Sequence, residues 1–133
     1  MHKVRLLSQS PTGCGISCIA MVANKNRKEV TDLYYKIRNK SRPQNTHCTN
    51  FVELQKLAIE CGISLSRKKK FKSWDSLPDR AILSINYHGP RRWHWVVFVR
   101  TSRSEYILDS GIYKKRVNFD KIRPRWYMEV SCE

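Results

Sequence analysis

Apolar side chains follow a helical spacing in the first half of the chain and a strand-like spacing in the second. Before Gly62 they recur about every three or four residues in three segments, which indicates amphipathic helices. The predicted helices run from about Gly15 to Ala23, from Arg27 to Arg38 and from Asn50 to Cys61. Asn50 can cap the third helix while Glu53 reaches back to its start, and Gly62 ends it.

From Ile63 onward the apolar residues alternate with polar ones or form short runs between turn residues, which is typical of β-strands. The predicted strands are Ile63 to Arg67, Ala81 to Tyr87, Trp93 to Arg100, Glu105 to Leu108 and Tyr113 to Val117, with a turn over Phe119 to Ile122 and an edge strand over Trp126 to Val130. The order of elements predicts an α+β fold, with N-terminal helices packed on a C-terminal antiparallel sheet. The length suits a single domain over 1–133.

A cysteine stands where the first turn gives way to the first helix. Pro11, Thr12 and Gly13 favour a tight turn, so Cys14 begins the helix. Unpaired backbone amides and the positive end of the helix dipole favour an anion there, which suits a thiolate nucleophile. Gln9 precedes it closely, and its side-chain amide is the predicted second donor of an oxyanion hole. The alternative role for Cys14 is that of a small core residue.

The second half of the chain supplies a base and an acid. His94 lies at the start of one predicted strand, and Asp109 follows the next, fifteen positions later. Two antiparallel strands joined by a polar turn over Thr101 to Ser104 would bring these side chains together. A carboxylate beside an imidazole fixes its orientation, as in a catalytic triad. Without Cys14, a hydrogen-bonded core histidine would be the simpler interpretation.

The order of these residues resembles the papain-like peptidase domain of bacteriocin-processing, double-glycine cysteine proteases. The resemblance rests on Gln9, on Cys14-Gly with Cys18-Ile-Ala-Met one turn later, on His94-Trp-Val-Val and on Tyr-Ile-Leu-Asp109, and these motifs span nearly the whole chain. The chain differs from the family pattern in three ways. Gln9 is one residue closer to the cysteine than is usual, Gly13 stands where an acidic residue is common, and Ser110 replaces a frequent proline.

The resemblance implies a papain-like cysteine endopeptidase that needs no metal or organic cofactor. Cys14 would be the nucleophile, His94 the base, Asp109 the orienting acid and Gln9 an oxyanion donor. It also implies cleavage of a protein or peptide substrate after two glycines. An amidase or deamidase could use the same residues, and a non-catalytic basic binding module is a further alternative.

Five cysteines, at positions 14, 18, 48, 61 and 132, form no Cys-x-x-Cys pair. Their odd number and irregular spacing argue against a disulfide framework and fit a reducing compartment. A zinc site could be built from His47, Cys48, Cys14 and Cys18, but structural zinc ligands usually occur in pairs at short fixed spacing. Cys18 and Cys61 fall on apolar helix faces and are predicted core residues.

The formal net charge is +15, from 26 Lys and Arg against 11 Asp and Glu. The basic residues cluster at Arg67-Lys-Lys-Lys70 with Lys72, at Arg91-Arg92 and at Lys114-Lys-Arg116. Solvated surface charge accounts for such clusters in many proteins, and the functional alternatives are an acidic protein partner, an acidic substrate surface or nucleic acid. We prefer protein, because no nucleic-acid-binding motif accompanies the basic residues.

The sequence also bears on where such an enzyme would act. It has no apolar run long enough to cross a bilayer, and residues 1–7 lack the apolar core of a secretory signal, so we expect no cleaved leader. Transporter segments, which commonly follow a processing domain, do not occur either. We therefore favour a toxin domain for interbacterial competition over a protease that matures a secreted peptide. It would act in the cytoplasm of the producing or target bacterium, arrive there through a secretion system as part of a larger polypeptide, and be neutralised by an acidic immunity protein.

Overall fold

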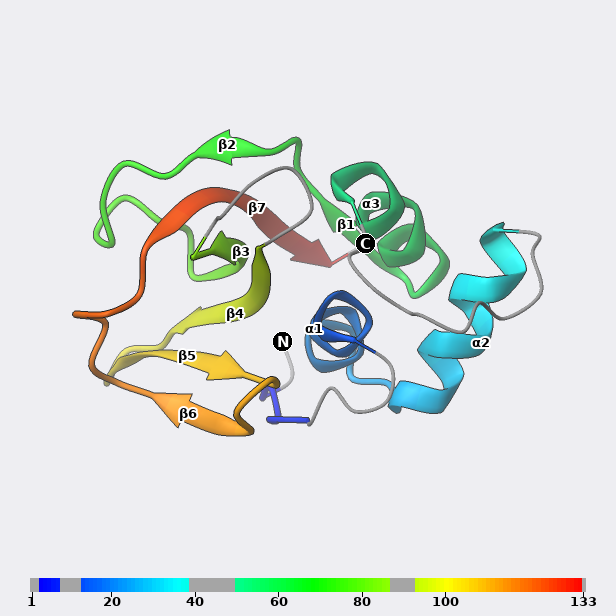
Figure 1. Ribbon diagram of the computed structural model, residues 1–133, viewed down its shortest axis with the longest axis horizontal. Coiled ribbons are helices and arrows are strands. Elements are labelled where there is room, and N and C mark those ends of the chain that lie inside the picture. Colours follow the sequence, from blue (N-terminus) through cyan, green and yellow to red (C-terminus); the bar gives the residue numbers. More distant parts are fainter. Residues whose placement is uncertain (1–2, 8–12, 39–49, 87–92, 133) are drawn as a thin grey trace.

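The computed structural model describes residues 3–7, 13–38, 50–86 and 93–132. Three helices come first along the chain and an antiparallel sheet follows, so the α+β class predicted from the hydrophobic pattern is confirmed (Figure 1). The helices are α1 (Cys14–Ala23), α2 (Arg27–Arg38) and α3 (Phe51–Glu60). None of the helices in the described part of the chain is long and apolar enough to cross a membrane.

The predicted ends of the third helix are confirmed. The Asn50 side chain accepts a hydrogen bond from the Glu53 N–H at 2.8 Å, and the Glu53 carboxylate accepts one from the Asn50 N–H at 3.1 Å. This reciprocal capping box satisfies two N–H groups that the helix itself leaves unpaired. Gly62 follows the last turn with φ of +84°, a left-handed conformation that glycine adopts without strain.

The strands are β1 (Ile63–Leu65), β2 (Lys69–Lys70), β3 (Arg80–Ile85), β4 (His94–Arg100), β5 (Glu105–Asp109), β6 (Lys114–Arg116) and β7 (Pro124–Cys132). Their order in the sheet is β1-β7-β3-β4-β5-β6, and β2 also pairs with β7. Every neighbouring pair is antiparallel. The turn expected over Phe119 to Ile122 is present, with the Ile122 N–H donating to the Phe119 carbonyl at 3.0 Å.

Two of the strand predictions are wrong in their details. The strand expected over Trp126 to Val130 is longer and lies between β1 and β3 instead of closing an edge. The strand expected over Ile63 to Arg67 stops at Leu65, and pairing resumes at β2. Side chains interrupt the ladder there, because the Ser66 hydroxyl accepts the Glu129 N–H at 2.8 Å and the Gln55 amide donates to the Ser66 carbonyl at 3.0 Å.

The alternation of side chains along β4 explains its unbroken apolar sequence. Trp95, Val97 and Val99 point into the core that the sheet shares with the helices, whereas Val96 and Phe98 belong to a second core on the opposite face. A strand that is covered on both faces carries apolar side chains on both of them. Loop residues cover the second face, among them the aromatic side chains of Phe71, Trp74 and Phe119.

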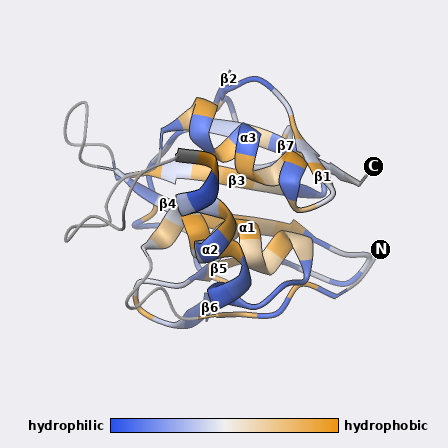
Figure 2. Cartoon of the chain, turned by 90° about the vertical axis from the view of Figure 1, so that its right-hand side faces the viewer, coloured by the Kyte–Doolittle hydropathy of each residue, from blue (hydrophilic) through white to orange (hydrophobic). Residues whose placement is uncertain are grey.

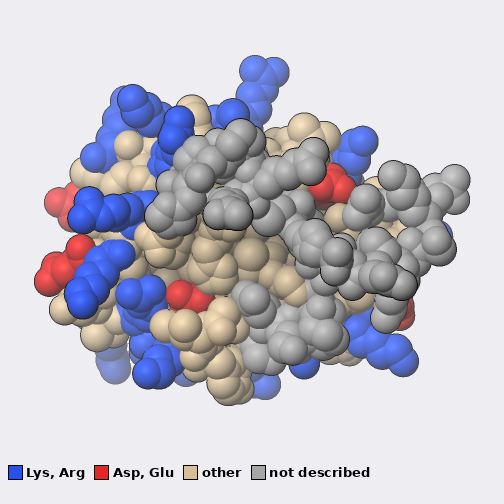
Figure 3. Space-filling model, in the orientation of Figure 1, with Lys and Arg blue, Asp and Glu red and all other residues tan. Residues whose placement is uncertain are grey.

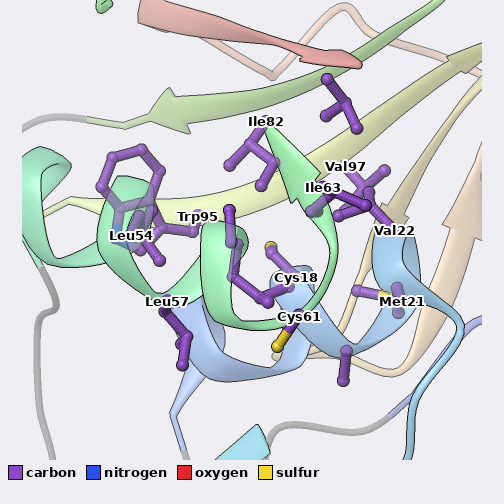
Figure 4. Packing of buried hydrophobic residues seen from close by; sticks show 14 of the residues in the cluster. Cys18, Met21, Val22, Leu54, Leu57, Cys61, Ile63, Ile82, Trp95 and Val97 are labelled. Atoms are coloured by element: carbon purple, nitrogen blue, oxygen red, sulfur yellow. The ribbon is translucent and has the colours of Figure 1, made fainter. Parts of the chain in front are cut away.

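The larger core lies between the helices and the sheet (Figure 4). It is continuous from Cys18, Met21 and Val22 of α1 to Leu54 and Leu57 of α3 and to Ile82, Trp95 and Val97 of the sheet. Figure 2 shows α1 largely apolar and α2 largely hydrophilic, as expected for a helix enclosed by other elements and for one that covers them. Helix α1 packs directly on β4, which fixes the position of its N-terminus relative to the first residues of that strand.

Candidate active site

Cys14 is the first residue of α1 and is half-buried. Gly13 precedes it with φ of +93°, a backbone conformation that a residue with a side chain rarely adopts. None of the described side chains caps this helix end. The thiol therefore stands at a helix N-terminus whose N–H groups and dipole favour a negative charge, as the sequence predicts.

A backbone contact joins the thiol to the sheet. The Trp95 N–H donates to Cys14 Sγ at 3.4 Å. It can do so because the ladder between β4 and β5 has its last pair at Val97 and Leu108, so the first residues of β4 lie beyond that pairing. The packing of α1 on β4 thus brings the thiol next to the start of the strand that carries His94.

The predicted hairpin brings His94 and Asp109 together. Strands β4 and β5 pair antiparallel and are joined by a turn in which the Thr101 N–H donates to the Ser104 carbonyl at 2.9 Å. His94 Nε2 lies 2.7 Å from Asp109 Oδ1, within hydrogen-bonding distance. With Nε2 bonded to the carboxylate, Nδ1 is the ring nitrogen left to exchange a proton with the thiol.

The buried carboxylate of Asp109 has partners on both of its oxygens. Oδ1 accepts from His94 and, at 3.0 Å, from the Gly111 N–H, while an Arg116 guanidinium nitrogen lies 3.4 Å from Oδ2. Burial acts to raise the pKa of Asp109, but the hydrogen bond and charge of His94 and the N–H groups of Gly111 and Ile112 outweigh it and lower the pKa. The carboxylate is therefore anionic at neutral pH.

His94 is held in its charged form. Burial disfavours the imidazolium, yet hydrogen bonds to Asp109 and Cys14 and the negative charges of both raise the pKa of His94 from 6.5 to about 10. The His94 imidazolium is thus hydrogen-bonded to the sulfur of Cys14. Such a pair combines a nucleophile with the acid that must protonate the leaving group.

The neighbouring cysteines differ sharply from Cys14. Cys18 and Cys61 are buried, as predicted. Burial raises the pKa of the Cys18 thiol well above 9.0, and the nearby charges of Cys14 and Asp109 raise it further. Burial also raises the pKa of the Cys61 thiol. Among the cysteines whose side chains are described, only Cys14 combines partial exposure with a histidine partner.

Some predicted residues lie outside the described part of the chain. These are Gln9, the expected oxyanion donor, and His47 and Cys48 of the alternative zinc set. Within the described ranges no three His, Cys, Asp or Glu side chains are grouped as a metal site.

Sequence analysis assigned Arg116 no role at the site and grouped it with the other basic residues. Asp109 pairs with Lys114 across the β5–β6 ladder, and Arg116 lies two positions further along the same strand. Residues in such a diagonal relation on one face of a hairpin are within reach of long side chains. A predicted register for this hairpin would therefore have identified the contact.

The packing of Phe51 against two tryptophans is the second feature that sequence analysis missed. Phe51, at the start of α3, stacks on Trp93 with ring centroids 6.2 Å apart and meets Trp95 edge-on at 4.9 Å. These tryptophans flank His94 in sequence, so the start of α3 packs on the strand segment that carries the base. The contact joins elements far apart in the chain, and no local pattern indicates it.

The described side chains thus form a Cys–His–Asp arrangement, with the thiol on a helix and the other two groups on neighbouring strands. Comparison with protein-family models and with curated proteins gave no match to this chain.

Proposed function

We propose that this protein is a papain-like cysteine endopeptidase. The observation that carries the proposal is His94, whose Nε2 lies 2.7 Å from Asp109 and whose pKa of about 10 is raised by hydrogen bonds to both Asp109 and Cys14. An imidazolium in contact with a half-exposed thiol at a helix N-terminus is the arrangement that thiol hydrolysis requires. The papain-like assignment is supported by the placement of the nucleophile on a helix and of the base on an antiparallel sheet.

In the proposed reaction, the Cys14 thiolate attacks the scissile carbonyl carbon and its oxygen becomes an oxyanion. The His94 imidazolium then donates its proton to the amide nitrogen, the C–N bond breaks and the amine leaves. A thioester between Cys14 and the acyl group remains. Water attacks this thioester after giving a proton to His94, and the thiolate and the carboxylic acid product are released.

Two other groups complete the proposed mechanism. Asp109 keeps the His94 ring in the orientation that exposes Nδ1 and stabilises its positive charge. The Cys14 backbone N–H and the Gln9 side chain are the proposed donors to the oxyanion, at the place where the α1 dipole also favours negative charge.

For the substrate we propose a protein or peptide cut after two glycines, as the resemblance to double-glycine peptidases implies. For the biological setting we propose a toxin that acts on a bacterial protein and is silenced by an acidic immunity protein. Its net charge of +15 supports an acidic inhibitor, since complementary charge speeds association and favours the correct partner.

The decisive experiment compares wild type with Cys14→Ala on a peptide library that includes Gly-Gly sequences, with cleavage termini mapped by mass spectrometry. We expect cuts after Gly-Gly that disappear in Cys14→Ala and His94→Ala and persist in folded Cys61→Ala, which removes a thiol distant from the chemistry. Asp109→Ala and Gln9→Ala should keep residual activity, because orientation of His94 and oxyanion donation are each partial contributions. Loss of one oxyanion donor costs about a hundredfold to a thousandfold.

Other results would contradict this function. Release of ammonia without chain cleavage would identify a deamidase. No chemistry on any peptide or protein, together with tight and salt-sensitive binding to nucleic acid, would favour a basic binding module.

A further inference from the structure

A pocket lies at the start of α3. Its volume is about 430 Å³, and it lies between the start of α3 and the segment that joins β1 to β2. It is lined by Asn50, Phe51, Val52, Gln55, Arg67 and Lys68. Val52 is 57% exposed at this site, so the pocket offers apolar surface as well as positive charge.

The ammonium group of Lys68 is held in a defined place. Its Nζ lies 5.1 Å from the ring centroid of Phe51 and 4.6 Å from that of Trp126. Cation–π contacts with two rings restrain a long side chain that otherwise samples many rotamers. Lys68 is nevertheless exposed, so an anion can still approach its ammonium group.

A single aromatic side chain, Phe51, is shared between the pocket and the start of β4. Phe51 forms part of the pocket wall and packs against both Trp93 and Trp95. The backbone N–H of Trp95 donates to Cys14 Sγ, and His94 lies between the two tryptophans in sequence. Phe51 therefore joins the wall of the pocket to the strand segment that carries His94.

The charge around the pocket is strongly one-sided. Arg67, Lys68 and the two residues of β2, Lys69 and Lys70, are all exposed, and none of them forms an ion pair with another described residue. Figure 3 shows basic side chains along the upper edge of the molecule, where Figure 1 draws β2. An anionic ligand would supply the missing counter-charge.

We propose that this surface, formed by Phe51, Val52, Gln55, Arg67 and Lys68, binds an acidic segment of the protein substrate next to the scissile bond. Carboxylates of the segment pair with Arg67 and Lys68, and a neighbouring apolar side chain contacts Val52. The proposal rests on the proposed protease function and specifies its substrate class.

The aromatic rings of the surface favour a polypeptide over nucleic acid. Lys68 lies over the rings of both Phe51 and Trp126, and Phe51 also stacks on Trp93. Single-stranded nucleic acid is bound without sequence preference by stacking its bases on aromatic side chains. These rings already have partners, whereas Arg67 and Lys68 form no ion pair with a described acidic residue.

The test uses internally quenched peptides with one Gly-Gly site and a neighbouring segment made of Asp and Glu or of Asn and Gln, placed before the site in one pair and after it in another. For at least one placement, wild type should cleave the acidic peptide about tenfold more efficiently by kcat/KM, as expected for two or more charged contacts. The preference should shrink as salt screens the charges. In Arg67→Gln/Lys68→Gln it should fall to near unity, with the neutral peptide cleaved as before.

The matched control is Arg103→Gln/Lys121→Gln, which removes the same charge from exposed turns. It should keep the preference. If both double variants lost the preference for the acidic peptide equally, net charge alone would explain it and the proposal would be overturned. Equal cleavage of acidic and neutral peptides by wild type would overturn it as well, because the enzyme would then not select for charge.

A binding measurement separates this proposal from the protease function itself. If wild type cleaves neither peptide, the protease proposal fails, and anisotropy of the labelled acidic peptide with Cys14→Ala still reports on the surface. Binding that Arg67→Gln/Lys68→Gln abolishes would support it, and unchanged binding would overturn it. Tighter binding of a single-stranded oligonucleotide than of the acidic peptide, with the same dependence on these residues, would overturn the choice of a polypeptide.

Discussion

The protonation state of the candidate site belongs to three side chains together. Asp109 and Cys14 raise the pKa of His94, and His94 in turn lowers the pKa of Asp109. Interacting groups of this kind titrate as a unit, so a change at one of them shifts the behaviour of the others. The consequences can be measured residue by residue.

Cys14 should be the first of the described thiols to be alkylated near neutral pH. It is half-buried next to an imidazolium, whereas burial keeps Cys18 and Cys61 in the thiol form and out of reach. Brief iodoacetamide treatment followed by peptide mass spectrometry checks this, with His94→Ala expected to slow the labelling. Modification of Cys18 or Cys61 ahead of Cys14 in the folded protein would contradict the assignment.

The pH profile of kcat/KM should extend far into the alkaline range. The imidazolium must be present to stabilise the thiolate and to protonate the leaving amine, and its pKa of about 10 means that activity falls only as pH rises through about 10. The pKa of Asp109 is lowered, so its protonation should matter only below the ordinary value of 3.8. An alkaline limb near 6.5 would instead indicate an unperturbed histidine.

Arg116 should act as a positioning residue. It lies 3.4 Å from Asp109 Oδ2, so Arg116→Gln leaves the carboxylate freer to turn and weakens its hold on His94. We expect kcat/KM to fall about fivefold, the equivalent of ~1 kcal/mol for a partly exposed pair, and the alkaline limb to move to lower pH. Lys115→Gln is the control, because Lys115 lies over the Tyr106 ring at 4.4 Å. Equal pH profiles for both variants would assign Arg116 a merely structural role.

At the scale of the elements, local signals decided what could be predicted. The capping residues of α3 and the polar turn between β4 and β5 lie next to the groups they position, so the sequence indicates them directly. The placement of β7 between β1 and β3 depends on strands remote in the chain, and its short alternating pattern does not specify neighbours. The break between β1 and β2 likewise depends on Ser66 meeting Glu129 of another strand.

The same distinction holds for the site. Cys14 is placed by its own turn and helix, and His94 and Asp109 by one hairpin, so their meeting could be predicted. Arg116 required a hairpin register, and Phe51 required the packing of α3 beside β4. Contacts between elements far apart in the chain are therefore what could not be predicted from the sequence.

The capping box of α3 offers a test of element stability. Asn50→Ala removes the acceptor for the Glu53 N–H and should lower the free energy of unfolding by about 1 kcal/mol, whereas Asn50→Gly should cost only a few tenths. Urea denaturation with a common slope for all variants measures the difference. Equal losses for both variants would show that the cap does not stabilise the helix. Because Phe51 follows the cap, a frayed α3 should also weaken its contact with Trp93.

At the scale of the whole molecule, the site lies where the helical layer meets the sheet (Figure 1), and Lys and Arg side chains outnumber Asp and Glu on the face drawn in Figure 3. A chain with a net charge of +15 attracts acidic partners over distances comparable with the Debye length, about 8 Å at physiological salt. An acidic protein that covers Cys14 and His94 would therefore associate quickly and block the chemistry at once.

The toxin proposal predicts that harm to a cell depends on the thiol and not on the charge. Expression of wild type in the bacterial cytoplasm should arrest growth, whereas Cys14→Ala, which has the same net charge of +15 and the same basic surface, should not. Growth curves after induction, with both proteins at equal abundance, measure the difference. Co-expression of a small acidic protein that binds over the site should restore growth, and its association should slow as salt is raised. Equal arrest by wild type and Cys14→Ala would reject a proteolytic toxin. Harmless expression of an enzyme shown to cleave peptides would instead favour maturation of a secreted peptide, because proteolysis would then spare the essential proteins of the cell.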